Sequence, residues 1–272
     1  MKLQKKKKGN WSLHLMMLPS VTALVIFSYV PMAGIIIAFQ KFNPGFGLFG
    51  ESPWVGLDNF RYIFSLPSIW QVVGNTLILS VAKIIIGTIL AIATALLLNE
   101  CRHRFLKKSV QTIIYFPYFI SWIIMAGILA DMLSPAKGVI NQLITALGGE
   151  PVYFLGDNRY FRGTLIVSDI WKNFGYNSVV YLAAITGIDM SLYEAAAIDG
   201  AGRWKQTVHV TLPGMSVIII LMVILNMGNL LNAGFDQVFN LYSPGVYESG
   251  DIIDTMVFRL GIQQGQLSPS TA

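Results

Sequence analysis

Residues 191–214 read SLYEAAAIDGAGRWKQTVHVTLPG. This stretch is polar and is interrupted by Gly200 and Gly202, yet it lies between two long apolar runs at about 164–188 and 213–233. A helix of roughly 20 mainly apolar residues crosses a bilayer core of about 30 Å. The two runs are therefore candidate membrane spans, and the quoted stretch is the loop between them.

The composition of the whole chain supports a membrane protein. Of 272 residues, 54% are hydrophobic and only 12% are charged, which is unusual for a soluble protein. A weaker apolar patch at 252–262 follows the last long run. We therefore expect an all-α membrane protein with five complete spans, at about 13–39, 70–98, 110–132, 164–188 and 213–233.

The distribution of Lys and Arg predicts the orientation, because cytoplasmic loops retain these residues. With the N-terminus inside, the inner segments carry eleven of them and the outer segments five. Residues 1–12 are then a cytoplasmic tail, and residues 189–213 face the cytoplasm. An uncleaved first span is favoured over a secretory signal peptide, because the apolar run is long and no small-residue cleavage site follows it promptly.

Several kinds of chemistry are missing from the sequence. It has no G-x-x-x-x-G-K-[ST] phosphate loop, no dinucleotide-binding glycine motif and no His, Cys and carboxylate cluster at metal-ligand spacing. The single Cys101 excludes an internal disulfide. We expect no metal site and no ATPase site in this chain, so uphill transport would draw on an ion gradient or on another chain.

The quoted loop carries the signals of a short helix followed by a turn. Ser191 and Glu194 have the spacing of a capping box, which predicts a helix over 192–198. Gly200 and Gly202 predict a sharp turn after it, because glycine tolerates positive φ.

A second short helix is predicted over 203–210, and Pro213 suits the first turn of the next membrane helix. The loop could be a simple connector in which Glu194 is only a cap. Connectors between helices are often only a few residues long, however, so a longer loop with compact turns favours docking onto a partner.

The loop resembles a known family motif. Glu194-Ala195-Ala196, three residues, Gly200, nine residues and then Val210-Thr211-Leu212-Pro213 is similar to the EAA loop of membrane-spanning subunits of bacterial ATP-binding-cassette importers. The family pattern has Ile where this chain has Val210, a change that keeps the shape of the side chain.

The rest of the chain is similar to the permeases for oligosaccharides and polysaccharide fragments. The phrases that carry this resemblance are NTLILS from residue 75, ALLLNE from 95, YFPYFISW from 115, GVINQL from 138, YLAAITGID from 181 and FDQVFNLY from 235. These permeases usually have six core helices. The chain stops where the sixth would begin, so we expect only the start of a sixth span and a truncated C-terminus.

The resemblance implies one type I ABC importer transmembrane domain over residues 1–272, with residues 189–213 as the loop that docks on an ATPase subunit. Arg203 and Lys205 would be available to meet acidic or polar groups there. The expected coupling residues are Glu194, Ala195, Ala196, Ala197, Asp199, Gly200, Arg203, Leu212 and Pro213.

The resemblance also implies the partners and the location. These are a second, homologous permease, two ATPase subunits that hold ATP and Mg, an external sugar-binding protein and an oligosaccharide substrate. No cofactor is expected in this chain, and the location is the bacterial cytoplasmic membrane with a cytoplasmic N-terminus.

Polar side chains inside the spans are candidates for the substrate path, because polar groups facing lipid are costly. Amides offer donors and acceptors for sugar hydroxyls, but they can equally join helices, and some of the aromatic residues can be packing residues. Lys83 and Asp169 are more simply explained as a structural ion pair. The candidate path residues are Asn226, Asn229 and Asn232 on one predicted helix face, and Trp171, Asn173, Tyr176 and Asn177.

Two other classes of protein remain open at this point. One is an ion-coupled secondary carrier, which would call for buried carboxylates at broken helices, whereas only Asp169 lies clearly within a span. The other is a membrane scaffold or sensor whose cytoplasmic loop recruits a partner without transport.

Overall fold

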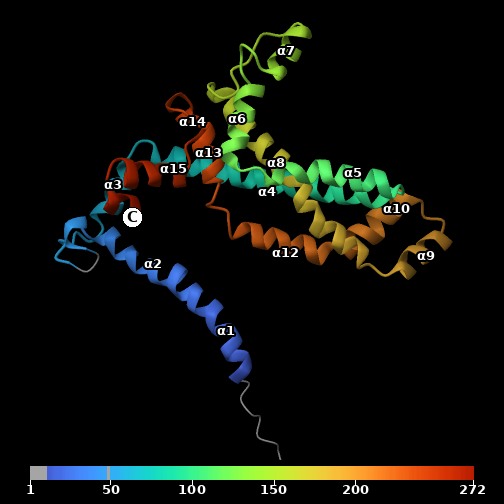
Figure 1. The fold of residues 1–272 in the computed structure, drawn as a ribbon, viewed down its shortest axis with the longest axis horizontal. Coiled ribbons are helices and arrows are strands. Elements are labelled where there is room, and N and C mark those ends of the chain that lie inside the picture. Colours follow the sequence, from blue (N-terminus) through green and yellow to red (C-terminus); the bar gives the residue numbers. More distant parts are fainter. Residues whose placement is uncertain (1–10, 48–49) are drawn as a thin grey trace, which may run out of the picture. The chain divides into compact units, whose positions relative to one another are not determined.

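The computed structural model describes residues 11–47 and 50–272, which form helices joined by turns (Figure 1). The described residues form two compact units, one of residues 11–47, 50–66 and 257–272 and the other of residues 67–256. Within the described ranges the only strand-like pairing is an isolated antiparallel bridge between Gln40 and Trp54, so the predicted all-α class is confirmed. The lysine-rich tail, over residues 1–10, lies outside the described residues.

The first unit begins with a long apolar helix. Residues His14–Phe39 are helical, apolar and long enough to cross a membrane, which agrees with the predicted first span. The helix contains one π-helical turn and ends in a 3-10 segment. Its consecutive parts are α1 (Trp11–Leu24), η1 (Val25–Tyr29), α2 (Val30–Met32) and η2 (Ala33–Phe39).

Aromatic and polar contacts hold the rest of this unit together. The ring of Phe39 stacks on that of Trp54 with centroids 5.7 Å apart, next to the Gln40–Trp54 bridge. The backbone N–H of Phe42 donates a hydrogen bond of 2.9 Å to the Ser268 hydroxyl. The other elements of the unit are η3 (Pro44–Phe46), α3 (Asp58–Ser65), η7 (Arg259–Gln263) and α16 (Leu267–Thr271).

The second unit is built on two long helices that pack along each other, α4 (Ile69–Glu100) and α8 (Asn158–Thr186). Helix α4 matches the predicted second span and is one continuous helix that is long and apolar enough to cross a membrane. Near one end of the pair, Leu79 and Leu165 join a buried apolar cluster. Further along, Tyr181 joins a second buried cluster. The region between the two clusters holds polar side chains.

The predicted third span, 110–132, is not one straight helix. Helix α5 (Arg104–Tyr115) runs into the 3-10 turn η4 (Phe116–Phe119), and α6 (Trp122–Met132) then leaves at an angle of 105°. Pro117 has no N–H for the helical ladder, and the Ser121 hydroxyl accepts a hydrogen bond of 3.4 Å from the N–H of Ile124 at the start of α6. In the structure the predicted third span is therefore a bent pair of helices.

The predicted fifth span, 213–233, is also corrected. The helix that follows the loop is α12 (Ser216–Met227), and residues 228–234 form turns before α13 (Phe235–Leu241). Asn232 takes part in this turn, because its Oδ1 accepts a hydrogen bond of 3.1 Å from the N–H of Gly234. Asn229 and Asn232 therefore do not share a helix face with Asn226.

The segment after α13 is attached to the long helices by buried polar groups. Asn75 of α4 donates hydrogen bonds to the carbonyls of Glu248 and Asp251, at 3.1 and 3.0 Å, and accepts one of 2.7 Å from Arg162 of α8. These bonds hold down α14 (Tyr247–Gly250). Outside the 189–213 loop, the remaining elements of this unit are α7 (Val139–Ala146), η6 (Pro244–Val246) and α15 (Ile253–Phe258), the last of which continues into the first unit.

Among the described residues, two helices are long and apolar enough to cross a membrane, and up to five spans result if each bent helix pair is counted as one. The upper value equals the predicted number of complete spans. The bends come at the third span and on either side of the 189–213 loop, at angles of 105°, 70° and 56°.

Helix α8 approaches α5 closely at Gly175. A Cβ atom added there would lie 2.1 Å from the carbonyl oxygen of Ile114, so Gly175→Ala should destabilise the protein by about 1–3 kcal/mol through overpacking. Thermal unfolding of the purified protein in detergent measures the loss. Gly163→Ala is the matched control, because it lies on the same helix with open space around it. Equal effects of the two substitutions would contradict the packing argument.

Candidate functional site

The loop of residues 189–213 begins with the helix α9 (Met190–Ile198). The predicted capping box is wrong, since Ser191 lies inside the helix and Asp189 is the N-cap. The Asp189 carboxylate accepts a hydrogen bond of 2.9 Å from the backbone N–H of Ser191. That bond, with one from the Ser191 side chain, holds the pKa of Asp189 below its usual value. Asp189 takes the capping role because an N-cap carboxylate can reach the orphan N–H two residues on.

The other end of α9 forms the predicted glycine turn. Gly200 has φ +74°, and the N–H groups of Gly200 and Ala201 donate to the carbonyls of Ala197 and Ala196, at 3.0 and 2.9 Å. This is a Schellman motif with glycine in the left-handed position. Gly202 has φ −68° and precedes the next helix, so the positive φ falls on Gly200.

The second helix of the loop is longer than predicted. It runs through α10 (Arg203–Gln206), a π-helical turn η5 (Thr207–Thr211) and α11 (Leu212–Gly214), and bends by 56° before α12. Pro213 thus lies near the end of this helix, and the expectation that Pro213 starts the membrane helix was wrong. Proline lacks an N–H and disturbs the helical ladder, and here the break falls just after it.

Two side-chain contacts attach the loop to itself and to α4. The hydroxyl of Tyr193 on α9 lies 3.0 Å from that of Thr211. The Arg203 guanidinium donates a hydrogen bond of 2.7 Å to the carboxylate of Glu100, at the end of α4. Arg203 is therefore engaged within the chain, whereas Lys205 is exposed. The first contact joins the two loop helices to each other, and the second joins the loop to the end of a membrane span.

The loop exposes apolar side chains that none of the described residues covers. Ile198 is 87% exposed and Trp204 is 78% exposed, and Leu192 also lies on the surface. Such exposure outside the membrane spans is typical of an interaction surface. Of the predicted coupling residues, Ala196 and Leu212 are half-buried, and the exposed ones are Glu194, Ala195, Ala197, Asp199, Gly200, Arg203 and Pro213.

A polar cavity lies between α4, α8 and the segment after α12. It consists of two adjoining hollows of about 210 and 150 Å³, which share the side chains of Lys83, Ile84, Asp169 and Asn226. We call the two together the central cavity. Broken helices and polar groups within membrane spans are typical of transport pathways.

The structure places five of the predicted path residues around the central cavity. Asn173 and Asn177, one helical turn apart on α8, line the larger hollow, and Asn226 lines both. Asn229 and Asn232 line the smaller hollow, reached through the turn after α12 and not along a helix face. The three amides that the sequence pattern grouped therefore lie around one hollow, but the predicted helix face is not what brings them together.

The two predicted aromatic residues lie elsewhere. Trp171 lines a separate, mainly apolar hollow together with Leu129 of α6. The ring of Tyr176 stacks on that of Tyr118, with centroids 3.8 Å apart. Neither residue lines the central cavity, because α8 turns the side chains of Trp171 and Tyr176 away from the face that carries Asn173 and Asn177.

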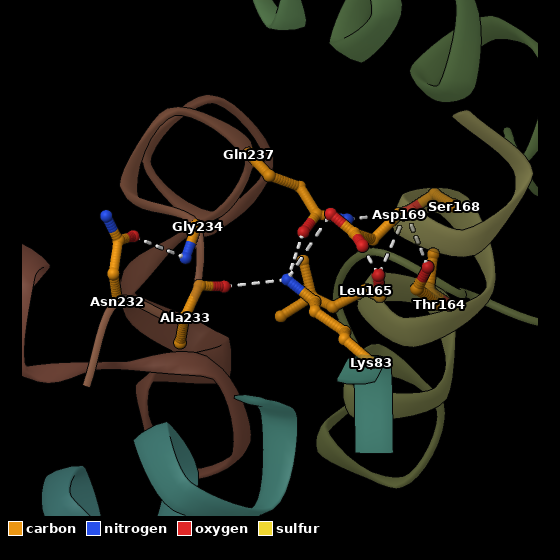
Figure 2. A network of polar contacts seen from close by, with 9 residues as sticks. All are labelled: Lys83, Thr164, Leu165, Ser168, Asp169, Asn232, Ala233, Gly234 and Gln237. Atoms are coloured by element: carbon orange, nitrogen blue, oxygen red, sulfur yellow. Dashed lines mark hydrogen bonds and ion pairs between the residues drawn. The ribbon is translucent and has the colours of Figure 1, made fainter. Parts of the chain in front are cut away.

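Lys83 is the centre of a polar network in the central cavity (Figure 2). Its ammonium lies 3.9 Å from the Asp169 carboxylate, which confirms the predicted pair. It also donates hydrogen bonds to the carbonyl of Ala233, at 2.7 Å, and to Oε1 of Gln237. The lysine on α4 thereby ties α8 to the turn before α13.

Gln237 is the residue of this network that sequence reasoning missed. It is fully buried, and its Nε2 donates to the carbonyl of Leu165 and the hydroxyl of Ser168, at 2.7 and 2.8 Å. Gln237 lies within the phrase FDQVFNLY, which carried part of the family resemblance.

Lys172 has a role that differs from that of Lys83. It is buried, and its ammonium donates hydrogen bonds to the carbonyls of Pro117, Tyr118 and Ile120, all at the break between α5 and α6. It also lies over the rings of Tyr118 and Trp122, at 5.6 and 5.5 Å. A helix break leaves carbonyls unsatisfied, and Lys172 satisfies them.

No group of three or more His, Cys, Asp or Glu side chains that could hold a metal ion occurs in the part of the chain that the structure describes. The central cavity offers amides that can bind hydroxyls and one ion pair, and the 189–213 loop offers a separate surface for a partner.

Residues 84–235 match the family model of the binding-protein-dependent transport system inner membrane component. The chain belongs to this family. The match includes both the 189–213 loop and most of the central cavity. Membership decides between the classes that the sequence left open, in favour of the importer: the chain is a permease subunit of a binding-protein-dependent ABC transporter and a helical membrane protein.

Relatives and solved structures extend this similarity over nearly the whole chain. The polygalacturonan/rhamnogalacturonan transport system permease protein YteP of Bacillus subtilis is 44% identical, over 96% of this chain and 81% of the relative. Protein LplB of the same organism is 40% identical, over 98% and 83%.

The crystal structure of a bacterial ABC transporter that imports the acidic polysaccharide alginate matches with a TM-score of 0.88 and 38% identity, over 97% of this chain and 88% of that chain. The same transporter in complex with an alginate pentasaccharide-bound periplasmic protein matches equally well. The predicted type I importer fold is confirmed by this likeness.

Proposed function

We propose that this chain forms one half of the translocation path for an acidic oligosaccharide or polysaccharide fragment, and that ATP hydrolysis on partner chains drives the import. The central cavity supports this proposal, because five amides and an ion pair line it and amides suit sugar hydroxyls. Two of the similar proteins carry the names of acidic polysaccharides, which favours an acidic substrate.

The 189–213 loop is the proposed contact with an ATPase subunit. Its helix α9 is capped at both ends, its apolar residues Ile198 and Trp204 are exposed, and Arg203 attaches it to the end of α4. A rigid loop of this kind transmits displacement to the spans, and movement of the loop would rock α4 and α12. This exposed, doubly capped helix is the observation that carries the coupling proposal.

The partners follow from the same proposal. They are a second, non-identical permease that completes the path, two ATPase subunits that hold ATP and Mg, and an external sugar-binding protein that delivers the substrate. This chain would bind no cofactor and would hydrolyse no ATP. Its N-terminus and the 189–213 loop would lie on the cytoplasmic side of the bacterial cell membrane.

The reconstituted four-chain complex tests the function. With ATP present, adding the substrate-loaded binding protein should raise ATP hydrolysis, whereas the unloaded binding protein should raise it less. A complex that contains all four chains and gives no response to the loaded protein would contradict the importer function.

Glu194→Ala should lower uptake while leaving membrane insertion and basal ATP hydrolysis intact. Glu194 is exposed on α9 and the structure gives its side chain no part in capping the helix, so the loss would come from the contact with the ATPase subunit. Uptake into proteoliposomes measures the effect. Glu150→Ala is a matched control, since Glu150 is exposed in the segment after α7. If Glu194→Ala takes up substrate normally, the Glu194 carboxylate has no role in coupling.

A further inference from the structure

We propose that Lys83 binds the carboxylate of an acidic sugar during transport and that Asp169 is the counter-ion that it exchanges for that carboxylate. This inference rests on the proposed import of saccharides and names the residue that recognises the acid group. Lys83 is the one lysine that lines the central cavity among the described residues, and it lies where the two hollows meet.

The contacts of Lys83 leave one donor for a ligand. An ammonium has three N–H groups, and two of them donate to Ala233 and Gln237. The third has no hydrogen bond within the described ranges, because the 3.9 Å to Asp169 exceeds hydrogen-bond length. The side chain is thus held in place by two neutral acceptors and keeps its charge directed at the cavity.

Asp169 is held more loosely than Lys83. None of the residues that the structure describes donates a hydrogen bond to its carboxylate, and its side chain is 22% exposed, against 9% for Lys83. It lines both hollows. The half-buried Asp169 carboxylate therefore keeps its acceptor capacity free for sugar hydroxyls once another anion reaches Lys83.

Exchange of one anion for another avoids the cost of an unpaired charge. Without a counter-ion, Lys83 would be a lone cation inside a membrane protein, which is destabilising. A uronate carboxylate restores the pairing when it displaces Asp169, and the pair forms again when the sugar leaves. Asn173, Asn226 and Asn229 around the pair can bind the remaining hydroxyls. A neutral sugar gains the amide contacts but not the ionic one.

Equilibrium binding to the assembled complex, in nanodiscs with a non-hydrolysable ATP analogue and without binding protein, tests the exchange. The probes are a galacturonate trisaccharide and its fully methyl-esterified form, which has the same hydroxyls without the charge. We expect the wild type to bind the acid more tightly. Lys83→Met should weaken binding of the acidic trisaccharide by about tenfold or more and binding of the ester by less than about twofold. Lys83→Arg should keep the preference, and Asp169→Asn should tighten binding of the acid by removing the competing anion.

Lys137→Met is the matched control, since Lys137 is exposed and far from the cavity in sequence, and it should change neither affinity. If Lys83→Met still assembles and weakens the binding of both probes equally, the role of Lys83 is purely structural. Binding of neither probe by a complex that responds to its loaded binding protein would also overturn the exchange. Loss of that response in the wild type would instead contradict the importer function.

Discussion

Gly200→Val should separate ATP hydrolysis from uptake. Gly200 has φ +74° at the C-terminal end of α9, a conformation that costs a β-branched residue about 1–2 kcal/mol or more. The strain would undo the Schellman motif that fixes α9 against the second loop helix. If this strain disfavours the docked conformation of the loop by the same free energy, we expect substrate-stimulated uptake to fall by about tenfold. Basal ATP hydrolysis and membrane insertion should persist.

Gly202→Val is the control for this prediction. A Cβ atom at either glycine meets open space, but Gly202 has φ −68°, so only Gly200→Val is strained. The measurements are uptake and ATP hydrolysis by the same proteoliposomes. If both variants take up substrate normally, the loop is a simple connector, and if both fail alike, bulk and not backbone conformation is responsible.

Lys172→Met should give the largest loss of stability. Lys172 donates to three carbonyls at the break between α5 and α6 and lies over two aromatic rings. Leaving a buried acceptor unsatisfied costs about 1–3 kcal/mol, so the three together account for several kcal/mol. We expect a large fall in the unfolding temperature of the purified complex, or failure to assemble.

Two further variants give this prediction its controls. Lys137→Met removes an exposed lysine and should leave the unfolding temperature unchanged. Lys172→Arg keeps the charge and should recover part of the loss. If Lys172→Met unfolds at the same temperature as the wild type, water and not the lysine satisfies the carbonyls at the break.

The sequence predicts most of the fold because apolar runs of membrane length are a strong signal. The spans at 13–39 and 70–98 correspond to continuous helices. The break within 110–132 was missed because the donor that makes it possible, Lys172, lies more than fifty residues further along the chain. Such a long-range hydrogen bond leaves no local pattern.

The candidate site was also predicted only in part, because some of its features are local and others depend on long-range contacts. The helix and turn of the loop follow from local glycine chemistry, so the Gly200 turn was correct, while the N-cap shifted from Ser191 to Asp189 because both residues can cap. The three asparagines at 226, 229 and 232 line one hollow through a turn that the periodicity did not predict. Gln237 was missed because its partners come from α4 and α8.

Uptake of a labelled oligosaccharide into proteoliposomes that contain the four-chain complex tests the central claim most directly. With loaded binding protein outside and ATP inside, the account predicts accumulation, and it predicts none when ATP is omitted and a proton or sodium gradient is supplied in its place. Accumulation driven by the ion gradient without ATP would contradict the account.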